Sequence, residues 1–486
     1  MSRLSKSNYL KGIQCMKSLF LKIYHPELRD EISEEQQAIF DKGHLVGRTA
    51  QKLFPEGIDA SEGKHIEVKR SLEYTKELIN KGIDVIYEAA FEYDGVLCYM
   101  DILVKENGKW KAYEVKGSTG LKDYYLHDAS LQYYVINNAG LKLDDIFLAH
   151  LNNKYVRKGK LEVKELFTVE TVKDKVIAMQ GSVKENIVMF KNLLAQKNIP
   201  DIDIGDYCSN PYNCDFIGYC WKHIPENSVF NISKLRREKK FDLYRKGILN
   251  FNDIPKNYPL NNSQRMQVNS ELNSNIYRDQ KKLDQFRKNL KYPLYFMDFE
   301  TIQPAIPLFN NSRSYQQIPF QYSLHILEKP GATLQHFEFL GKPPKDPRTD
   351  FITTLLDNIG KTGSILVYNK AFEIRILKDI ARDFPEYKIQ IEETLTRIVD
   401  LMEPFRDKYI YKPEMKGSYS IKHVLPAMVP GFSYSTLDIQ NGSIASNTFE
   451  SMYYDVDKYS INEKRKQLLE YCKMDTLAMV KILEKI

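Results

Sequence analysis

Residues 85–116 constrain the fold more than any other part of the chain. Three segments rich in β-branched and aromatic residues, 85–93, 96–105 and 110–116, are separated by Asp94-Gly95 and Asn107-Gly108. Asp-Gly and Asn-Gly favour two-residue β-hairpins, because both turn positions need a positive φ. The pattern therefore predicts an antiparallel meander of three strands.

The meander carries charged residues in a suggestive arrangement. Asp101 lies on the second predicted strand, and Glu114 and Lys116 share one face of the third. Pairing across the hairpin can place Asp101 beside Glu114. Two carboxylates suit a hard divalent cation, and an ammonium group can orient water or offset charge during phosphodiester hydrolysis. The alternative is a surface salt bridge across a hairpin.

With Gln132 and the two tyrosines that follow it, these residues resemble the PD-(D/E)xK pattern of RecB-like exonucleases, including the CRISPR-adaptation-associated branch. The resemblance implies a restriction-endonuclease-like domain. It also implies that Asp101 and Glu114 bind metal, with Lys116 and Gln132 as further catalytic residues.

The RecB-like pattern is incomplete at one position. The family often places a metal-binding histidine on an early helix, and Gly47 stands there in this chain. His44 is one turn off register, so we expect it to be an exposed helix residue.

The six cysteines are too sparse for a disulfide framework. Cys208, Cys214 and Cys220 share a turn-rich segment, and Cys15 lies near the start of the chain; this favours zinc or an iron–sulfur cluster over structural thiols. The RecB-like resemblance implies that these four hold a 4Fe-4S cluster, with structural Zn²⁺ as the alternative. Cys98 and Cys472 fall in strand and helix patterns, and we expect them to be buried thiols.

A second set of carboxylates follows the apolar strand predicted from residue 294. Alternation points Asp298 and Glu300 to one side, and in the last predicted helix Tyr471 and Asp475 are one turn apart. Buried carboxylates are costly unless they are paired or bind metal. The alternative for Asp475 is a residue at the rim of the core, bonded to a backbone amide.

These residues resemble the DEDD exonucleases of the DnaQ-like, RNase H-type fold. The match includes Asn369 to Glu373, although Glu373 replaces the usual aspartate of that motif. The resemblance implies a 3′ to 5′ exonuclease with two Mg²⁺ or Mn²⁺ ions and a tyrosine that positions the attacking water. Its metal ligands would be Asp298, Glu300, Glu373 and Asp475, and its tyrosine Tyr471.

The whole chain resembles a little-characterised bacterial family that fuses these two modules, on the segments 4–17 and 417–426. Lys422 in the second segment would contact phosphate or lie in a simple surface turn. The sequence predicts an α/β protein with three parts: a nuclease domain over 1–225, a basic helical connector over 226–290 and an exonuclease domain over 291–486.

The connector is rich in lysine and arginine between Lys234 and Lys246, within a chain of 70 basic and 64 acidic residues. Two interpretations of this basic segment are possible: a solvated helical connector, or a surface along which nucleic acid binds.

Elsewhere the periodicity predicts helices over 30–55, 64–81, 125–137, 169–196, from 371 and over 462–486, and strands over 146–151 and 365–368.

The first residues contain no apolar run of signal-peptide or membrane-spanning length. We therefore expect a cytoplasmic protein that binds no membrane. The two nuclease resemblances imply that its partner is nucleic acid, most of all DNA. The function expected is metal-dependent hydrolysis of DNA, with RNA as the second substrate class. Two alternatives are an accessory nucleic-acid-binding protein with degenerate sites and a zinc-stapled interaction module.

Overall fold

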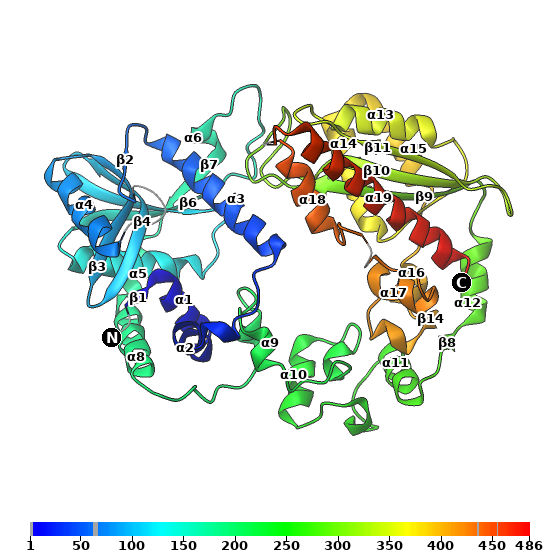
Figure 1. The fold of residues 1–486 in the computed structure, drawn as a ribbon, viewed down its shortest axis with the longest axis horizontal. Helices are drawn as coiled ribbons and strands as arrows, with labels where there is room; N and C mark the ends of the chain where they lie inside the picture. Colours follow the sequence, from blue (N-terminus) through cyan, green and yellow to red (C-terminus); the bar gives the residue numbers. More distant parts are fainter. Residues whose placement is uncertain (1–2, 62–66, 435–436, 454) are drawn as a thin grey trace. The chain divides into compact units, whose positions relative to one another are not determined.

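The structure, a computed structural model, describes residues 3–61, 67–434, 437–453 and 455–486. Helices and strands alternate through both halves, which confirms the predicted mixed α/β class (Figure 1). The chain forms two compact units: residues 1–223 with 304–316, and residues 224–303 with 317–486.

The first unit is built on a seven-stranded sheet in the order β2-β3-β4-β5-β6-β7, with β1 paired to β4. Nine α-helices of the described chain belong to it. The strands are β1 (Leu4–Ser5), β2 (Ile58–Asp59), β3 (Val85–Tyr93), β4 (Val96–Glu106), β5 (Lys109–Lys116), β6 (Leu143–Leu151) and β7 (Phe167–Thr171). The helices are α1 (Lys6–Gln14), α2 (Met16–Tyr24), α3 (Glu34–Ala50), α4 (Val68–Asn80), α5 (Tyr125–Asn138), α6 (Val163–Leu166), α7 (Lys173–Ala178), α8 (Gln180–Leu194) and α9 (Ile217–Cys220).

The predicted meander is present as β3, β4 and β5, paired antiparallel. Asp94 and Asn107 have φ angles of 50° and 51°, as the hairpin turns require. After β5 the chain crosses over through α5 and returns as β6, parallel to β5. The helix predicted over 125–137 and the strand predicted over 146–151 are therefore confirmed.

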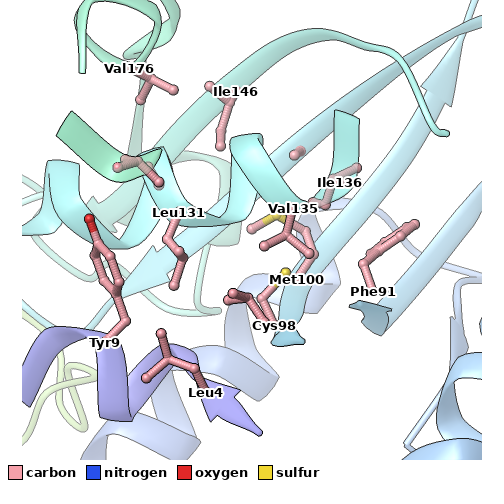
Figure 2. Packing of buried hydrophobic residues seen from close by; sticks show 14 of the residues in the cluster. Leu4, Tyr9, Phe91, Cys98, Met100, Leu131, Val135, Ile136, Ile146 and Val176 are labelled. Atoms are coloured by element: carbon pink, nitrogen blue, oxygen red, sulfur yellow. The ribbon is translucent and has the colours of Figure 1, made fainter. Parts of the chain in front are cut away.

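A continuous apolar core lies under this sheet. Figure 2 shows Leu4 and Tyr9 from the start of the chain close to Cys98, Met100 and Leu131. Because Leu4 pairs with Val96 and is 1% exposed, the first strand is locked into the sheet by both backbone and side chain.

The single helix predicted over 169–196 is wrong. Residues up to Thr171 form β7, which pairs antiparallel with β6, and two helices follow it, α7 and α8. Thr168, Val169 and Thr171 are β-branched, and their strand preference prevails where an edge of the sheet is open to pair with them. The predicted helix 64–81 is observed as α4, and its residues 64–66 lie outside the described residues.

Residues 304–316 belong to the first unit although β9 (Leu294–Ile302) and β10 (Ile318–Leu327), which flank them in sequence, belong to the second. Arg157 donates through Nη1 to the carbonyls of Pro307 and Leu308, both at 2.9 Å. Ala305 is buried in the cluster that contains Val46, and Tyr315 donates to the carbonyl of Gly117. Nothing in the local sequence of this segment predicts that placement.

The second unit contains a five-stranded sheet in the order β11-β10-β9-β12-β13. β10 is antiparallel to both β11 and β9, and β12 is parallel to both β9 and β13. The strands of this sheet are β9 (Leu294–Ile302), β10 (Ile318–Leu327), β11 (Gln335–Leu340), β12 (Ser364–Val367) and β13 (Ile398–Asp400). Two short strands, β8 (Tyr277–Arg278) and β14 (Ile410–Tyr411), form a separate antiparallel pair. The helices are α10 (Arg237–Arg245), α11 (Asn262–Asn273), α12 (Gln280–Lys288), α13 (Arg348–Asn358), α14 (Lys370–Asp383), α15 (Lys388–Leu395), α16 (Glu403–Arg406), α17 (Ile421–Met428), α18 (Gly442–Ser451) and α19 (Lys458–Leu483).

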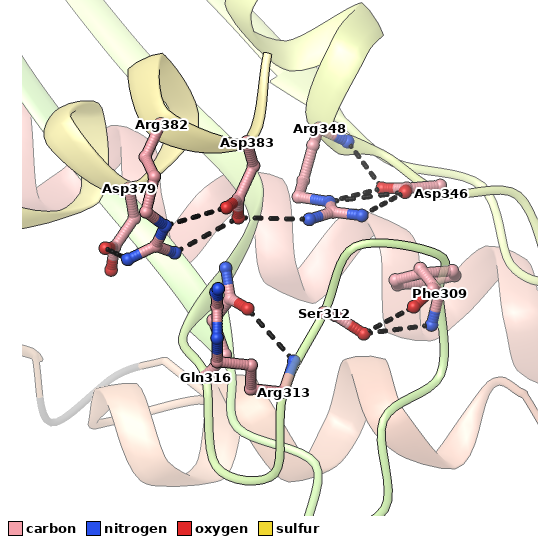
Figure 3. Close-up of polar contacts among 9 residues, drawn as sticks. All are labelled: Phe309, Ser312, Arg313, Gln316, Asp346, Arg348, Asp379, Arg382 and Asp383. Atoms are coloured by element: carbon pink, nitrogen blue, oxygen red, sulfur yellow. Dashed lines mark hydrogen bonds and ion pairs between the residues drawn. The ribbon is translucent and has the colours of Figure 1, made fainter. Parts of the chain in front are cut away.

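A buried arginine stabilises the helical layer of this unit. Arg348, at the start of α13, is 1% exposed and donates to Asp346 at 2.7 Å and to Asp383 at 3.4 Å. Figure 3 shows this network together with Arg382, which bonds the same Asp383 from the exposed side.

Residues 226–290 hold helices α10, α11 and α12 and a small apolar cluster of their own. Val229, Ile232 and Leu243 are fully buried in that cluster. No helix in the described part of the chain is long and apolar enough to cross a membrane.

Candidate metal centres

The first candidate centre lies where β4 and β5 pair. Ile102 faces Tyr113 across the ladder, so Asp101 and Glu114 occupy the next position along it. The backbone N–H of Val115 donates to Asp101 Oδ2 at 2.6 Å. Lys116 Nζ lies 2.8 Å from Glu114 Oε1, as the predicted shared face requires.

Gln132 reaches the same carboxylate from α5. Its Nε2 donates to Glu114 Oε2 at 2.5 Å and to the carbonyl of Tyr99 at 2.9 Å. The structure therefore brings together all four residues of the predicted set, Asp101, Glu114, Lys116 and Gln132. His44 is exposed on α3, as expected.

Three further charged residues complete this centre. Lys6 Nζ lies 2.7 Å from Glu114 Oε1, and Asp128 on α5 accepts from Lys116. Glu88 on β3 interacts electrostatically with Asp101 and has a positive φ of 51°. Sequence reasoning missed all three, because they lie outside the recognised motif, and Lys6 is 108 residues from its partner Glu114.

The carboxyl groups of the first centre have pKa values that are shifted in opposite directions. Burial alone would raise the pKa of Glu114, but the ammonium groups of Lys116 and Lys6 outweigh it and lower that pKa to about 2. Burial and the neighbouring Glu114 raise the pKa of Asp101 to about 7. Burial and Asp101 likewise raise the pKa of Glu88 to about 8. A divalent cation would relieve the repulsion that these shifts reflect.

The second candidate centre joins β9 to α19. Asp298, Glu300 and Asp475 each offer a carboxylate oxygen, and the three oxygens lie within 4.8 Å of one another. Burial raises the pKa of Asp298 and of Glu300, and neighbouring carboxylates raise both further. The pKa of Asp475 is raised by burial to about 6. Three oxygen ligands at this spacing can hold a hard cation such as Mg²⁺ or Mn²⁺.

Glu373 lies beside this group on the first turn of α14. It is 1% exposed, and its Oε2 has no hydrogen-bond partner among the described residues. Burial raises its pKa, as does the nearby Asp298. A buried carboxyl oxygen without a partner is costly, and a cation shared with Asp298 would remove that cost.

Two tyrosines contact the last carboxylate. Tyr434 donates to Asp475 Oδ1 at 2.6 Å, and a hydrogen bond from Tyr471 lowers the pKa of Asp475 against the effect of burial. Tyr471 was expected here, and Tyr434, from the loop before α18, was not. The positive charge of Lys422 on α17 acts on both Glu300 and Asp475.

The four cysteines of the predicted set line one small cavity in the first unit, together with Tyr207 and Phe216. All four are free thiols, and the N–H of Gly205 donates to Cys208 Sγ at 3.4 Å. The members are Cys15, Cys208, Cys214 and Cys220. Cys98 and Cys472 are fully buried elsewhere, as expected.

The four thiols lie close enough to influence one another electrostatically. Burial raises the pKa of Cys15, and the neighbouring Cys214 and Cys208 raise it further. Four cysteines that line one cavity are a ligand set that zinc or an iron–sulfur cluster could use.

Comparison with known proteins finds one family whose model matches about a quarter of this chain. The family described as "Domain of unknown function (DUF2779)" matches residues 295–420. That region contains Asp298, Glu300 and Glu373 and ends before Tyr471 and Asp475.

Three curated proteins are also similar to this chain. "Uncharacterized protein UU173" of Ureaplasma parvum is 27% identical over 332 residues, 62% of this chain and 47% of that protein. "Uncharacterized protein MG366" of Mycoplasma genitalium is 29% identical over 213 residues, 40% of this chain and 32% of that protein. "Uncharacterized protein MG366 homolog" of Mycoplasma pneumoniae is 28% identical over 221 residues, which are 40% of this chain and 32% of that protein. The chain spans about half or less of the length of these relatives.

Proposed function

We propose that this chain is a metal-dependent nuclease with two separate sites, one in each unit. The observation that carries the proposal is the buried group of Asp298, Glu300 and Asp475, with Glu373 beside it lacking any hydrogen-bond partner for Oε2 in the described chain. Burying these carboxylates away from water costs free energy, and a bound cation would offset that cost. Phosphodiester hydrolysis uses oxygen ligands of this kind to hold divalent cations.

The topology of each unit supports a specific fold assignment. In the first unit, an antiparallel meander, a crossover helix and a parallel strand carry Asp101, Glu114, Lys116 and Gln132, as expected of a PD-(D/E)xK nuclease. In the second, the strand order with β9 at the centre and helix α19, which carries Asp475, against it suits an RNase H-like exonuclease of the DEDD type.

In the first site, Asp101 and Glu114 would hold a divalent cation, and this cation would supply an activated water and stabilise charge on the leaving oxygen. Lys116 keeps its ammonium group 2.8 Å from Glu114 Oε1 and over the face of Tyr125. Its role is to orient the water and to offset charge that develops on the phosphate. Gln132 fixes the rotamer of Glu114.

In the second site, Asp298, Glu300 and Asp475 would hold one divalent cation, and Glu373 together with Asp298 would hold another. Tyr471 positions the attacking water near Asp475. Lys422 is exposed at the start of α17 and acts on Glu300 and Asp475, which suits contact with a substrate phosphate. The activity proposed for this site is 3′ to 5′ exonucleolytic hydrolysis.

We further propose that Cys15, Cys208, Cys214 and Cys220 bind a 4Fe-4S cluster. The proposal rests on the four cysteines that line one cavity, and structural Zn²⁺ is the alternative occupant. Purified protein that is brown and contains about four irons and four sulfides per chain would support the proposal. Colourless protein with stoichiometric zinc would contradict it.

One observation favours a second candidate function. Glu373 is a methylene longer than the aspartate of the DEDD pattern, and its oxygens lie outside the tight three-carboxylate group. A nucleic-acid-binding accessory protein with a degenerate second site would share this feature. Tight, salt-sensitive binding without turnover would identify it.

The proposed function is tested with Mg²⁺ or Mn²⁺ on end-labelled single- and double-stranded DNA and RNA. We expect the wild type to cleave DNA, and the double variant Lys116→Ala, Asp298→Ala to leave every substrate intact. Wild-type protein that cleaves none of these substrates would contradict the proposal.

A further inference from the structure

Helix α1 begins with a lysine, which is an unfavourable place for one. The N-terminus of a helix carries partial positive charge, so cations there are destabilising by a few tenths of a kcal/mol or more. The first turn of α1 contains no acidic residue that would offset Lys6. The compensating charge comes from Glu114, 108 residues away in sequence, at 2.7 Å.

The backbone of Lys6 is held firmly on both sides. Ser5 caps the helix by accepting from the N–H of Asn8 at 3.2 Å. Leu4 pairs with Val96 in the sheet, and the ring of Tyr9 packs edge-on against Phe190 (Figure 2 shows Leu4 and Tyr9). The ammonium group of Lys6 therefore cannot leave the first centre through a backbone movement that spares the core.

Lys6 and Lys116 share one carboxylate oxygen but differ in their remaining contacts. Lys116 bonds Glu114 and Asp128 and lies over the ring of Tyr125, and its side chain is 13% exposed. Lys6 bonds Glu114 alone among the described residues, and its side chain is 25% exposed. An ammonium group has three N–H donors, so Lys6 keeps two of them for a group that arrives from solvent.

The carboxylates of the first centre would repel a polyanionic substrate before any cation binds. Asp101, Glu114 and Asp128 surround the two lysines. Lys116 uses two of its three donors on these carboxylates, whereas Lys6 uses one and has the more exposed side chain.

We propose that Lys6 is a second substrate-binding lysine of the first site, which contacts a backbone phosphate of the nucleic acid beside the bond that is cleaved. This inference rests on the proposed function of that site. Glu114 orients the ammonium group, and the two free N–H donors bind non-bridging phosphate oxygens. The contact is independent of base identity, because every nucleotide offers the same phosphate.

The test is the salt dependence of nucleic-acid binding, measured in EDTA so that metal-dependent cleavage does not occur. We expect Lys6→Met to weaken binding of a labelled single strand about fivefold to tenfold at 0.1 M salt. The slope of log affinity against log salt should fall in magnitude by about 0.7, the change for one lost phosphate contact on a single strand. Lys6→Arg should keep most of the affinity and the slope.

The matched control is Lys22→Met. Lys22 lies next to the start of α1, where it donates to Ser7 Oγ at 3.2 Å, and it has no carboxylate contact in the described chain. We expect this variant to bind and cleave as the wild type does. In a background with Asp298→Ala, Lys6→Met should raise KM at the first site about tenfold with a smaller effect on kcat; a role confined to folding would lower the active fraction instead.

One result would overturn the inference, and a second would overturn the proposed function alone. If the wild type cleaves but Lys6→Met leaves both the salt slope and KM unchanged, the role of Lys6 is wrong and the nuclease proposal stands. If the wild type does not cleave, the nuclease proposal fails, and the binding slope in EDTA still decides whether Lys6 contacts phosphate.

Discussion

Individual carboxyl groups set the energetics of both candidate centres. In the second unit, Asp298, Glu300, Glu373 and Asp475 are crowded together, and Lys422 supplies a nearby positive charge. Burial raises the pKa of each carboxyl, and neighbouring carboxylates raise the pKa of Asp298, Glu300 and Glu373 further. Without a cation, these residues therefore lower the stability of the fold that holds them.

Glu300→Gln should stabilise the metal-free protein, because it removes one buried like charge. We expect a gain on the order of 1–2 kcal/mol in the free energy of unfolding in EDTA. The same change should abolish the stabilisation that Mn²⁺ gives to the second unit. The exposed Glu392→Gln is the control and should behave as the wild type. A variant that is less stable in EDTA and still stabilised by Mn²⁺ would contradict the assignment of Glu300 as a ligand.

The raised pKa values also predict a pH dependence. Folded protein with raised carboxyl pKa values binds more protons than unfolded protein, so in EDTA stability falls as the pH rises. The loss continues through the pKa of Asp101, about 7, and approaches that of Glu88, about 8. Burial lowers the pKa of His325 and His336 to about 4. These two histidines make the free energy of unfolding rise with pH, but only below about pH 6.5, the ordinary pKa of histidine.

The measurement is chemical denaturation between pH 6.5 and 8, with EDTA and with Mn²⁺. We expect the free energy of unfolding to fall across this range in EDTA. Mn²⁺ should remove the decline, because it favours the ionised carboxylates. A free energy that rises with pH in EDTA would contradict these assignments.

At the scale of elements, α1 connects the first centre to the cysteine cavity. Lys6 is its first residue, Cys15 follows its last, and its nine residues span about 13 Å. Gln14 Nε2 donates to the carbonyls of Tyr207 and Tyr212 at 2.8 and 2.7 Å. Lys11 pairs with Asp215 at 3.0 Å. The helix is therefore tied directly to the segment that carries the other three cysteines.

Cys15→Ser should release one end of α1 and disturb Lys6 at the other. We expect loss of most of the iron and a fall of at least tenfold in first-site activity, with second-site activity within about twofold of the wild type. Cys98→Ser, at a buried thiol outside the cavity, should keep its iron. Full iron content in Cys15→Ser would contradict the ligand assignment.

The helical layer of the second unit offers a test of stability alone. Arg348→Ala would leave Asp383, with 5% side-chain exposure, next to a cavity, and should cost about 3–5 kcal/mol. Arg382→Ala removes the other partner of Asp383 from an arginine that is 47% exposed, and should cost less than about 1 kcal/mol. Urea denaturation of both variants gives the comparison. Equal losses would contradict the importance of the buried pair.

Elements with strong local signals could be predicted from the sequence. The meander follows from Asp94-Gly95 and Asn107-Gly108, and alternation along β5 correctly places Glu114 and Lys116 on one face. β7 could not be separated from the helices after it, because residues 169–196 also show helical periodicity. The partner strand β6 decides the structure there.

At the scale of the whole molecule, long-range contacts limit what the sequence can predict. Lys6 meets Glu114 across 108 residues, and residues 304–316 join the first unit from between two strands of the second. Neither placement has a local signature, because each depends on which surfaces the folded units present. The motif residues of both centres could be found, whereas Lys6, Glu88, Asp128 and Tyr434 required the structure.

The central claim is that the two units carry independent metal-dependent sites. It is tested most directly by comparing the wild type, Asp101→Asn and Asp298→Asn with Mn²⁺ on DNA labelled at either the 5′ or the 3′ end. We predict that Asp298→Asn removes stepwise loss from the 3′ end and keeps a second cleavage activity, and that Asp101→Asn does the reverse. Loss of all cleavage in either variant, or unchanged cleavage in both, would contradict the account.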